Sequence, residues 1–142
     1  MNTKQYLSQA VRLNQIINSK LEDLESLRSL AESATSNIRS DKVSVSGVTQ
    51  AMAEAAVSIV DLSREINAEI DMLVDLKREI HGLIRQVEDW DCRLLLEMRY
   101  INGKSWDEIA EQWNYSTRGI LKIHGRALKE VADIRQSFTL VP

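Results

Sequence analysis

The chain has 142 residues, of which 44% are hydrophobic and 5% aromatic, enough for one modest domain with an extension. Its formal net charge of −3 argues against a protein that coats nucleic acid indiscriminately, because such proteins are strongly basic. No apolar run is long enough to span a membrane, and the first residues lack a signal-peptide core, so we expect a cytoplasmic protein without a membrane partner. The only proline is Pro142 and there are five glycines, which leaves the chain free to be helical almost throughout.

Two long segments at the start of the chain carry apolar residues about every 3.5 residues, the spacing of a coiled-coil seam. The first seam is broken only at Lys20 and the second only at Glu69. Seams of this length are typical of coiled coils rather than of ordinary globular helices. The first contains Ala10, Leu13, Ile17, Lys20, Leu24, Leu27, Ala31, Ala34 and Ile38. The second contains Val48, Met52, Ala55, Ile59, Leu62, Ile66, Glu69, Leu73, Leu76, Ile80, Leu83 and Val87.

A polar, serine-rich stretch at residues 36–47 separates the two seams and is typical of a turn. The sequence therefore predicts that residues 1–87 form a long antiparallel helical hairpin. If facing residues have numbers that sum to 86, every layer fills, as when Leu13 meets Leu73. A slip of one heptad, to a sum of 93, moves the turn off the centre of the polar stretch, so we favour the first register.

Lys20 and Glu69 lie in adjacent layers in either register and can form an ion pair. A half-buried ion pair adds little net stability, but placing either charge against leucine would cost a few kcal/mol. We therefore interpret the pair as a device that sets the register of the hairpin.

The stretch at residues 94–131 has the spacing of a helix-turn-helix. Ser105 stands three residues before Glu108, as in a capping box that begins a short helix. Asn114 falls where the tight turn requires a positive φ, and Ser116 is a suitable N-cap for the second helix.

The sequence thus predicts a small helix-turn-helix module over residues 88–135, followed by a tail over 136–142. Its second helix has an inward stripe of Ile120, Ile123, Ala127, Leu128 and Val131. Residues 112–129 contain four basic and no acidic residues, whereas residues 88–111 contain seven acidic and three basic ones. Such a basic helix suits contact with the phosphates and base edges of double-stranded DNA, although a solvated face is the alternative. The DNA-binding residues we expect are Thr117, Arg118, Lys122, Arg126 and Lys129.

The segment RLLLEMRYINGKSWDEIAEQWNYSTRGILKIHGRALKEV resembles region 4 of sigma-70-type factors, in which an LRY helix precedes the helix-turn-helix and an AL pair closes the recognition helix. The whole chain is similar to a family of uncharacterised proteins encoded by phages and prophages of Gram-positive bacteria. That similarity includes the YLSQAVRLNQI segment of residues 6–16 and the INAEIDMLVDLKREI segment of residues 66–80. The C-terminal part is also similar to phage late-gene regulators of the RinA and ArpU type. These resemblances imply transcriptional control, with Thr117, Arg118, Lys122 and Arg126 facing DNA.

A wider apolar stripe lies outside the seams, and two helices alone cannot cover it. Either the hairpin packs against the C-terminal module or two copies associate. We predict a homodimer, because one short recognition helix rarely suffices for affinity. The stripe contains Leu7, Val11, Ile16, Leu21, Val60, Ile70, Val74 and Ile84.

Nothing in the sequence indicates an enzyme. It has no Gly-rich phosphate loop, metal-ligand spacing or nucleophile–base set, so we expect no catalytic residue, metal or cofactor. His124 and the single Cys92 are expected to be packing residues. The acidic residues at 88–91 are suited to capping the LRY helix. The small core of the module is expected to include Trp90, Trp106 and Trp113.

The leading hypothesis is a phage or prophage transcriptional regulator that binds double-stranded DNA. In that case the hairpin serves as a dimeriser or as a surface for host RNA polymerase. Two alternatives stay open. A DNA-packaging protein of the small terminase type also combines a helix-turn-helix with a coiled coil but should form a larger ring. An interaction protein would use the sigma-like module to contact polymerase and not DNA.

Overall fold

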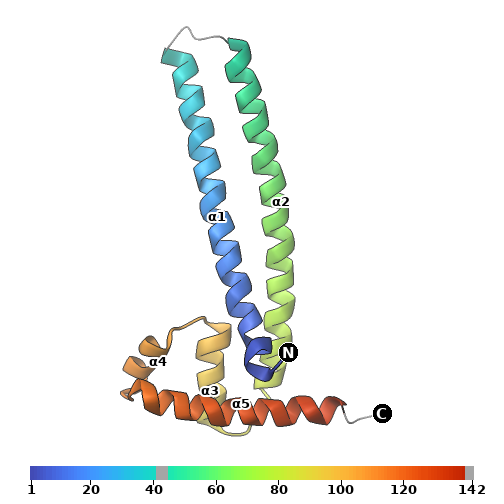
Figure 1. The fold of residues 1–142 in the computed structure, drawn as a ribbon, viewed down its shortest axis with the longest axis vertical. Helices are drawn as coiled ribbons and strands as arrows, with labels where there is room; N and C mark the ends of the chain where they lie inside the picture. Colours follow the sequence, from blue (N-terminus) through green and yellow to red (C-terminus); the bar gives the residue numbers. More distant parts are fainter. Residues whose placement is uncertain (41–44, 140–142) are drawn as a thin grey trace. The chain divides into compact units, whose positions relative to one another are not determined.

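The computed structural model describes residues 1–40 and 45–139, and all regular secondary structure within these ranges is helical. The expected all-α fold is therefore confirmed. None of the helices in these ranges combines the length and apolarity needed to cross a membrane. Figure 1 shows the elements, which in chain order are α1 (Thr3–Ser40), α2 (Val45–Ile84), α3 (Trp90–Leu96), the π-helical turn η1 (Glu97–Ile101), α4 (Trp106–Trp113) and α5 (Thr117–Thr139).

The two long helices extend further into the polar stretch at residues 36–47 than the sequence predicted. α1 continues to Ser40 and α2 begins at Val45. Residues 36–40 contain neither glycine nor proline, so nothing in their chemistry ends a helix. The centre of the stretch, residues 41–44, lies outside the described residues, as do the side chains of the seam positions Ile38 and Val48.

Contacts divide the chain into two compact units, and the division passes through both long helices. Unit 1 comprises Met1–Leu13 and Leu73–Pro142, and unit 2 comprises Asn14–Met72. We call unit 2 the hairpin arm, and residues 88–139 of unit 1 the C-terminal module. The boundary expected between residues 87 and 88 divides the chain by sequence order alone. The contacts instead group the first residues of α1 and the last residues of α2 with the C-terminal helices.

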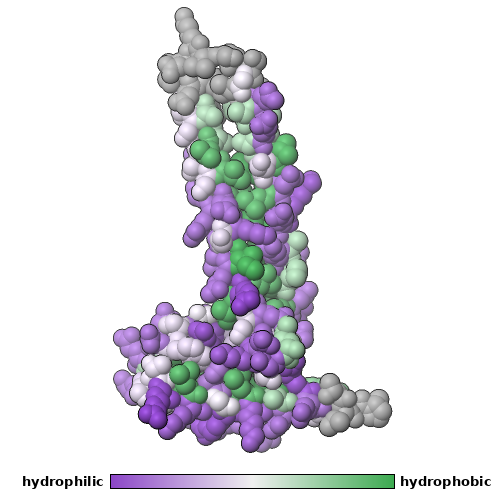
Figure 2. Space-filling view, in the orientation of Figure 1, coloured by the Kyte–Doolittle hydropathy of each residue, from purple (hydrophilic) through white to green (hydrophobic). Residues whose placement is uncertain are grey.

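In the hairpin arm, α1 and α2 run antiparallel with the predicted seam between them. Figure 2 shows hydrophobic side chains gathered along the line between the two helices and hydrophilic ones on the flanks. Ile17, Leu24 and Ile66 are buried, and the other described apolar seam residues of the arm are half-buried. A seam between only two helices leaves each layer partly open to water.

Ion pairs identify the register of the arm. Lys20 Nζ pairs with a carboxylate oxygen of Glu69 and lies 3.5 Å from Oε2 of Glu65. With a sum of 93, Lys20 would face Leu73, and Glu65 would lie about 12 Å further along α2. The contacts therefore favour the register near a sum of 86, and the predicted pairing of Lys20 with Glu69 is confirmed.

The outer apolar stripe has two different environments. Leu7 and Ile84, which belong to unit 1, have no exposed surface. In the hairpin arm, Leu21, Val60 and Ile70 keep 44%, 48% and 38% of their surface exposed. Packing within unit 1 thus covers Leu7 and Ile84 fully, although Val74 of the same unit keeps 48% of its surface exposed, and the three side chains of the arm are only partly covered.

The C-terminal module begins with a capped helix. Asp89 precedes α3, and its carboxylate accepts a hydrogen bond from the backbone N–H of Cys92 at 3.1 Å. The predicted capping by acidic residues is therefore confirmed for Asp89. The guanidinium of Arg93 donates two hydrogen bonds to the carbonyl of Val87, at 2.9 and 2.7 Å, and holds the chain that enters α3.

Trp90 does not lie in the core, contrary to the prediction, because 81% of its surface is exposed. It is the first residue of α3, whose buried face consists of Cys92, Leu95 and Leu96. Position 90 therefore falls on the solvent side of this short helix. The other two tryptophans are half-buried in the module, as expected.

Candidate nucleic-acid interface

The first helix of the motif begins with the predicted capping box. Ser105 Oγ accepts a hydrogen bond from the N–H of Glu108 at 3.1 Å, and the Glu108 carboxylate accepts one from the N–H of Ser105 at 3.3 Å. These reciprocal bonds satisfy two backbone donors that the helix itself cannot satisfy. The start of α4 is therefore determined by residues within one turn of it.

The turn between α4 and α5 has the backbone geometry that Asn114 predicted. Asn114 has φ 55° and ψ 38°, the left-handed conformation, in which Asn is less strained than most residues. The N–H of Tyr115 donates to the carbonyl of Ala110 at 3.0 Å, which closes the end of α4. Ser116 Oγ then accepts from the N–H of Gly119 at 3.0 Å, so the predicted N-cap of α5 is confirmed.

α5 packs its predicted inward stripe against the rest of the module. Ile120, Ala127 and Val131 have no exposed surface, Ile123 is almost fully buried and Leu128 is half-buried. Burial of these residues fixes which side of α5 faces solvent. The predicted stripe is confirmed, and α5 continues to Thr139, beyond the expected end of the module at residue 135.

All five predicted DNA-binding residues lie on the exposed side of α5: Thr117, Arg118, Lys122, Arg126 and Lys129. Three of them, Arg118, Lys122 and Lys129, fall within about 40° of one another around the helix axis, because the helix turns 100° per residue. Within residues 1–40 and 45–139, none of these three forms an ion pair. They therefore form one exposed basic stripe, which we call the basic face.

The other two predicted residues have polar surroundings inside the module. The Thr117 hydroxyl donates to a carboxylate oxygen of Asp107 on α4 at 3.4 Å, so it helps to join the two helices of the motif. The Arg126 guanidinium lies near Asp89 and contributes to lowering the pKa of that carboxyl, although the hydrogen bond from Cys92 N–H is the largest cause. The structure thus divides the five residues into three that face solvent only and two with neighbours in the module.

Two residues of the same face were missing from the sequence-based set. Leu121 keeps 45% of its surface exposed beside Lys122, and Gly125 is exposed one turn further along. Neither follows the inward stripe, and a search for basic residues overlooks both. The sequence did contain a signal for Leu121, because a large apolar residue at this position lies outside the inward stripe of α5.

A buried aromatic cluster holds α5 against the rest of the module. His124 Nε2 and the Tyr100 hydroxyl are 2.6 Å apart, and the Trp106 ring lies edge-on to His124 with centroids 4.5 Å apart. Burial, followed by the nearby charges of Lys4 and Arg99, lowers the pKa of His124 to about 4. The imidazole is therefore neutral at physiological pH and acts as a packing residue, as expected.

Asp89, Cys92 and Glu130 are the described residues that come closest to a metal-binding group, with potential ligand atoms within 4.8 Å of one another. The Asp89 carboxylate already caps α3, and the Cys92 thiol donates to the carbonyl of Ile123 at 3.9 Å. Burial, together with the charge of Asp89, raises the pKa of Cys92 to about 11, so the thiol stays protonated. These contacts account for Asp89 as a capping group and for Cys92 as a packing group.

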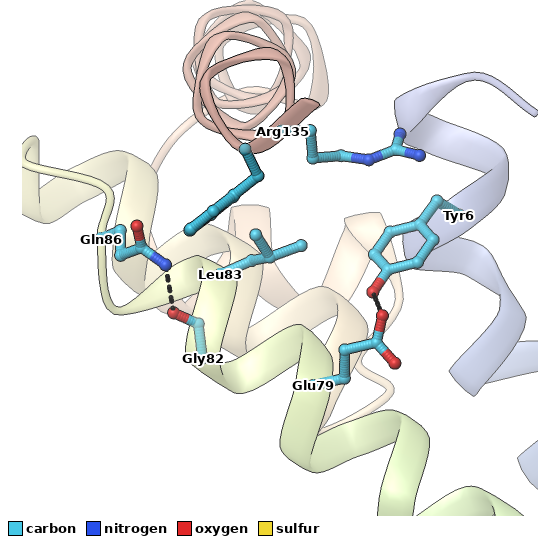
Figure 3. A pocket seen from close by; sticks show the side chains of 7 residues that line it. Tyr6, Glu79, Gly82, Leu83, Gln86 and Arg135 are labelled. Atoms are coloured by element: carbon cyan, nitrogen blue, oxygen red, sulfur yellow. Dashed lines mark hydrogen bonds between the residues drawn. The ribbon is translucent and has the colours of Figure 1, made fainter. Parts of the chain in front are cut away.

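A cavity of about 460 Å³ lies in unit 1, beside the first turns of α1, the end of α2 and the end of α5 (Figure 3). The Tyr6 hydroxyl donates to Glu79, and the Arg135 guanidinium lies 4.5 Å from the centre of the Tyr6 ring. Arg135 also donates to the Thr3 hydroxyl at 3.3 Å. No local sequence pattern indicates this cluster, because its members are far apart in the chain. The contacts join α5 to the ends of the two long helices.

The family described as "Protein of unknown function (DUF1492)" matches residues 32–132 of the chain. The chain therefore belongs to this family. No curated protein and no solved structure matches it.

Proposed function

We propose that this member of the DUF1492 family binds double-stranded DNA through α5 and regulates transcription for a phage or prophage, in the cytoplasm of its bacterial host. One observation carries the proposal. The basic face presents three cations that form no ion pair with any described residue, on a helix whose position is set by a capped, left-handed turn and a buried stripe. A rigidly held helix with exposed cations can enter the major groove, with the cations at the phosphates.

The separation of charge around the motif supports contact through one helix only. Residues 112–129 carry four basic and no acidic side chains, while α4 carries Asp107, Glu108 and Glu111, all exposed. DNA repels the carboxylates of α4 and attracts the cations of α5. This difference favours a pose in which α5 approaches the duplex first.

The hairpin arm is the proposed site of homodimerisation. Leu21, Val60 and Ile70 remain exposed there, and a second copy would cover them while supplying a second recognition helix. The similarity to sigma-70 region 4 and to RinA and ArpU regulators supports a role in transcription. Host RNA polymerase is a further candidate partner of the arm.

Fluorescence anisotropy with labelled duplex DNA tests the proposal. We expect binding at low salt that weakens steeply as salt is raised, with a slope set by the number of phosphate contacts. The Arg118→Ala/Lys122→Ala variant should bind far more weakly and reduce the salt slope by about 2. Arg64→Ala/Arg78→Ala is the matched control, because it removes the same charge from exposed positions of α2. Absence of binding to any duplex at low salt, or equal losses in both variants, would overturn the proposal.

The mass in solution distinguishes the regulator from a packaging protein. Light scattering should return a dimer, whereas a small terminase-like protein should return a larger ring. A protein that captures RNA polymerase equally well with and without Arg118 and Lys122, and binds no duplex, would be an interaction protein instead.

A further inference from the structure

An apolar side chain that the fold does not bury lies beside the basic face. Leu121 keeps 45% of its surface exposed, while its neighbours Ile120 and Ile123 are buried in the module. A single exposed leucine is ordinary on a protein surface. Its position beside the basic face becomes informative together with a second feature of the same helix.

Gly125, one turn after Leu121, has no structural reason to be glycine. Its backbone is helical, and a Cβ added there would meet no atom of the described residues within 4 Å. Gly103 differs, since its φ of 70° requires glycine, and at Gly119 a Cβ would lie 3.3 Å from Ser116 Oγ. Glycine inside a helix reduces the folding equilibrium up to about fivefold relative to alanine. Its usual benefit is close approach of the backbone to another molecule.

Leu121 and Gly125 lie next to the cations of the basic face, on one side of them. Around the helix axis they and Arg118, Lys122 and Lys129 fall within an arc of about 100°. The expected occupant of this surface is therefore a polyanion that offers an apolar group beside a row of negative charge. The major groove of B-form DNA has phosphates at both rims and the thymine C5-methyl group on its floor.

We infer that Leu121 contacts a thymine methyl group in the major groove and that Gly125 allows the backbone of α5 to approach the groove closely at that point. This inference rests on the proposed DNA binding. An α-helix with its side chains is about 10–12 Å across and the groove is about 12 Å wide, so even one extra methyl group on the approaching side displaces the helix. Leu121 thus determines a preference for thymine, and Gly125 determines the depth of the helix.

Uracil substitution tests the role of Leu121, because uracil differs from thymine only by the missing methyl group. The probe is a duplex selected from a random pool by the full-length protein, in which thymines are replaced by uracil one at a time. We expect about a fourfold loss of affinity at one thymine of each half-site, the value of one buried CH₂-sized group at 0.8 kcal/mol.

The Leu121→Ala variant should bind the thymine and uracil duplexes equally, and the Arg118→Ala variant should bind both more weakly while keeping the difference between them. Binding without any uracil effect, or a uracil effect that survives in Leu121→Ala, overturns the inference and leaves DNA binding in place. Failure to bind any duplex overturns the proposed function as well.

Gly125→Ala tests the close approach, with Gly82→Ala as its matched control. Both glycines are helical, and a Cβ at either would meet nothing within 4 Å. Both variants should melt at or above the temperature of the wild-type protein, but only Gly125→Ala should weaken binding to the selected duplex, by tenfold or more. If Gly125→Ala binds like the wild type, or changes the mass of the protein without changing its affinity for DNA, the close approach to DNA is wrong.

Discussion

The hairpin arm and the C-terminal module obtain their stability in different ways. The arm has one seam between two helices, where most apolar residues are half-buried and a charged pair interrupts the core. The module buries a compact set of side chains completely, among them Leu95, Leu96, Ile109, Ile120 and Val131. Each layer of the arm is partly open to water, whereas in the module α5 packs against both α3 and α4. Substitutions should therefore be tolerated in the arm and costly in the module.

The same difference separates the roles that we propose for the two regions. A repetitive, half-open seam suits association with another copy, because its exposed apolar side chains can be covered by a partner. A closed core with capped helix ends suits recognition, because it holds one helix face in a single position. The four experiments below test this contrast, in order of decreasing effect.

Matched isoleucine substitutions should show the contrast most strongly. Ile109→Ala, in the fully buried core of the module, should lower the free energy of unfolding by about 2–5 kcal/mol. Ile59→Ala, at a half-buried seam position of the arm, should lower it by roughly 1–2 kcal/mol, since less apolar surface is lost and no closed cavity forms. Urea denaturation measures both. Equal losses would contradict the distinction between the two cores.

Acid should weaken the module through His124. Its pKa in the folded protein is lowered from 6.5 to about 4, so below pH 6.5 the unfolded chain binds a proton that the folded protein does not. The part of the free energy of unfolding that depends on a neutral His124 is fully present above pH 6.5. It is lost as the pH falls toward 4, by about 3 kcal/mol in all. Urea melts of the wild type and of His124→Gln between pH 7 and 4 measure it. The variant should lack this part of the pH dependence, and identical pH profiles would contradict the role of the buried imidazole.

The stability of the turn between α4 and α5 should depend on Asn114, the residue in the left-handed conformation. Asn114→Ala should lower the free energy of unfolding by about 1–2 kcal/mol, because alanine tolerates φ 55° less well. Asn114→Gly is the control, since glycine adopts this conformation without strain and should be at least as stable. Thermal melts followed by tryptophan fluorescence report on the module, where all three tryptophans lie. An alanine variant as stable as the glycine variant would show that the backbone conformation is unimportant.

The charged pair of the arm should give the smallest net effect. Lys20→Leu leaves the Glu69 carboxylate without its main partner, and Glu69 Oε2 is already buried without a hydrogen bond. Each single leucine variant should therefore melt below the wild type, while Lys20→Leu/Glu69→Leu should melt above either single variant. Melting followed by circular dichroism measures this. A double variant that melts lower than both single variants would contradict the interpretation of the pair as a device that sets the register.

Much of the fold could be predicted because its signals are local. The capping box spans Ser105 to Glu108, and the N-cap bond of Ser116 reaches only to Gly119. Each depends on residue types three positions apart, so a linear sequence contains the whole interaction. The seams of α1 and α2 are likewise visible in the sequence, as apolar residues that recur about every 3.5 residues. The end of α1 was predicted too early because polar composition alone does not end a helix.

The amino-acid sequence by itself determined the helical elements, their caps and the inward face of α5, since these follow from periodicity and from contacts within one turn. Only the tertiary structure decided which side chains of the candidate nucleic-acid interface are free to contact another molecule. Thr117 donates to Asp107 across ten residues, Tyr100 meets His124 across 24, and Tyr6 meets Glu79 across 73. No local pattern specifies such pairs, because they exist only once helices from different parts of the chain pack together. The same packing placed Trp90 in solvent, buried Leu7 and Ile84, and left Leu121 exposed beside the cations of the basic face.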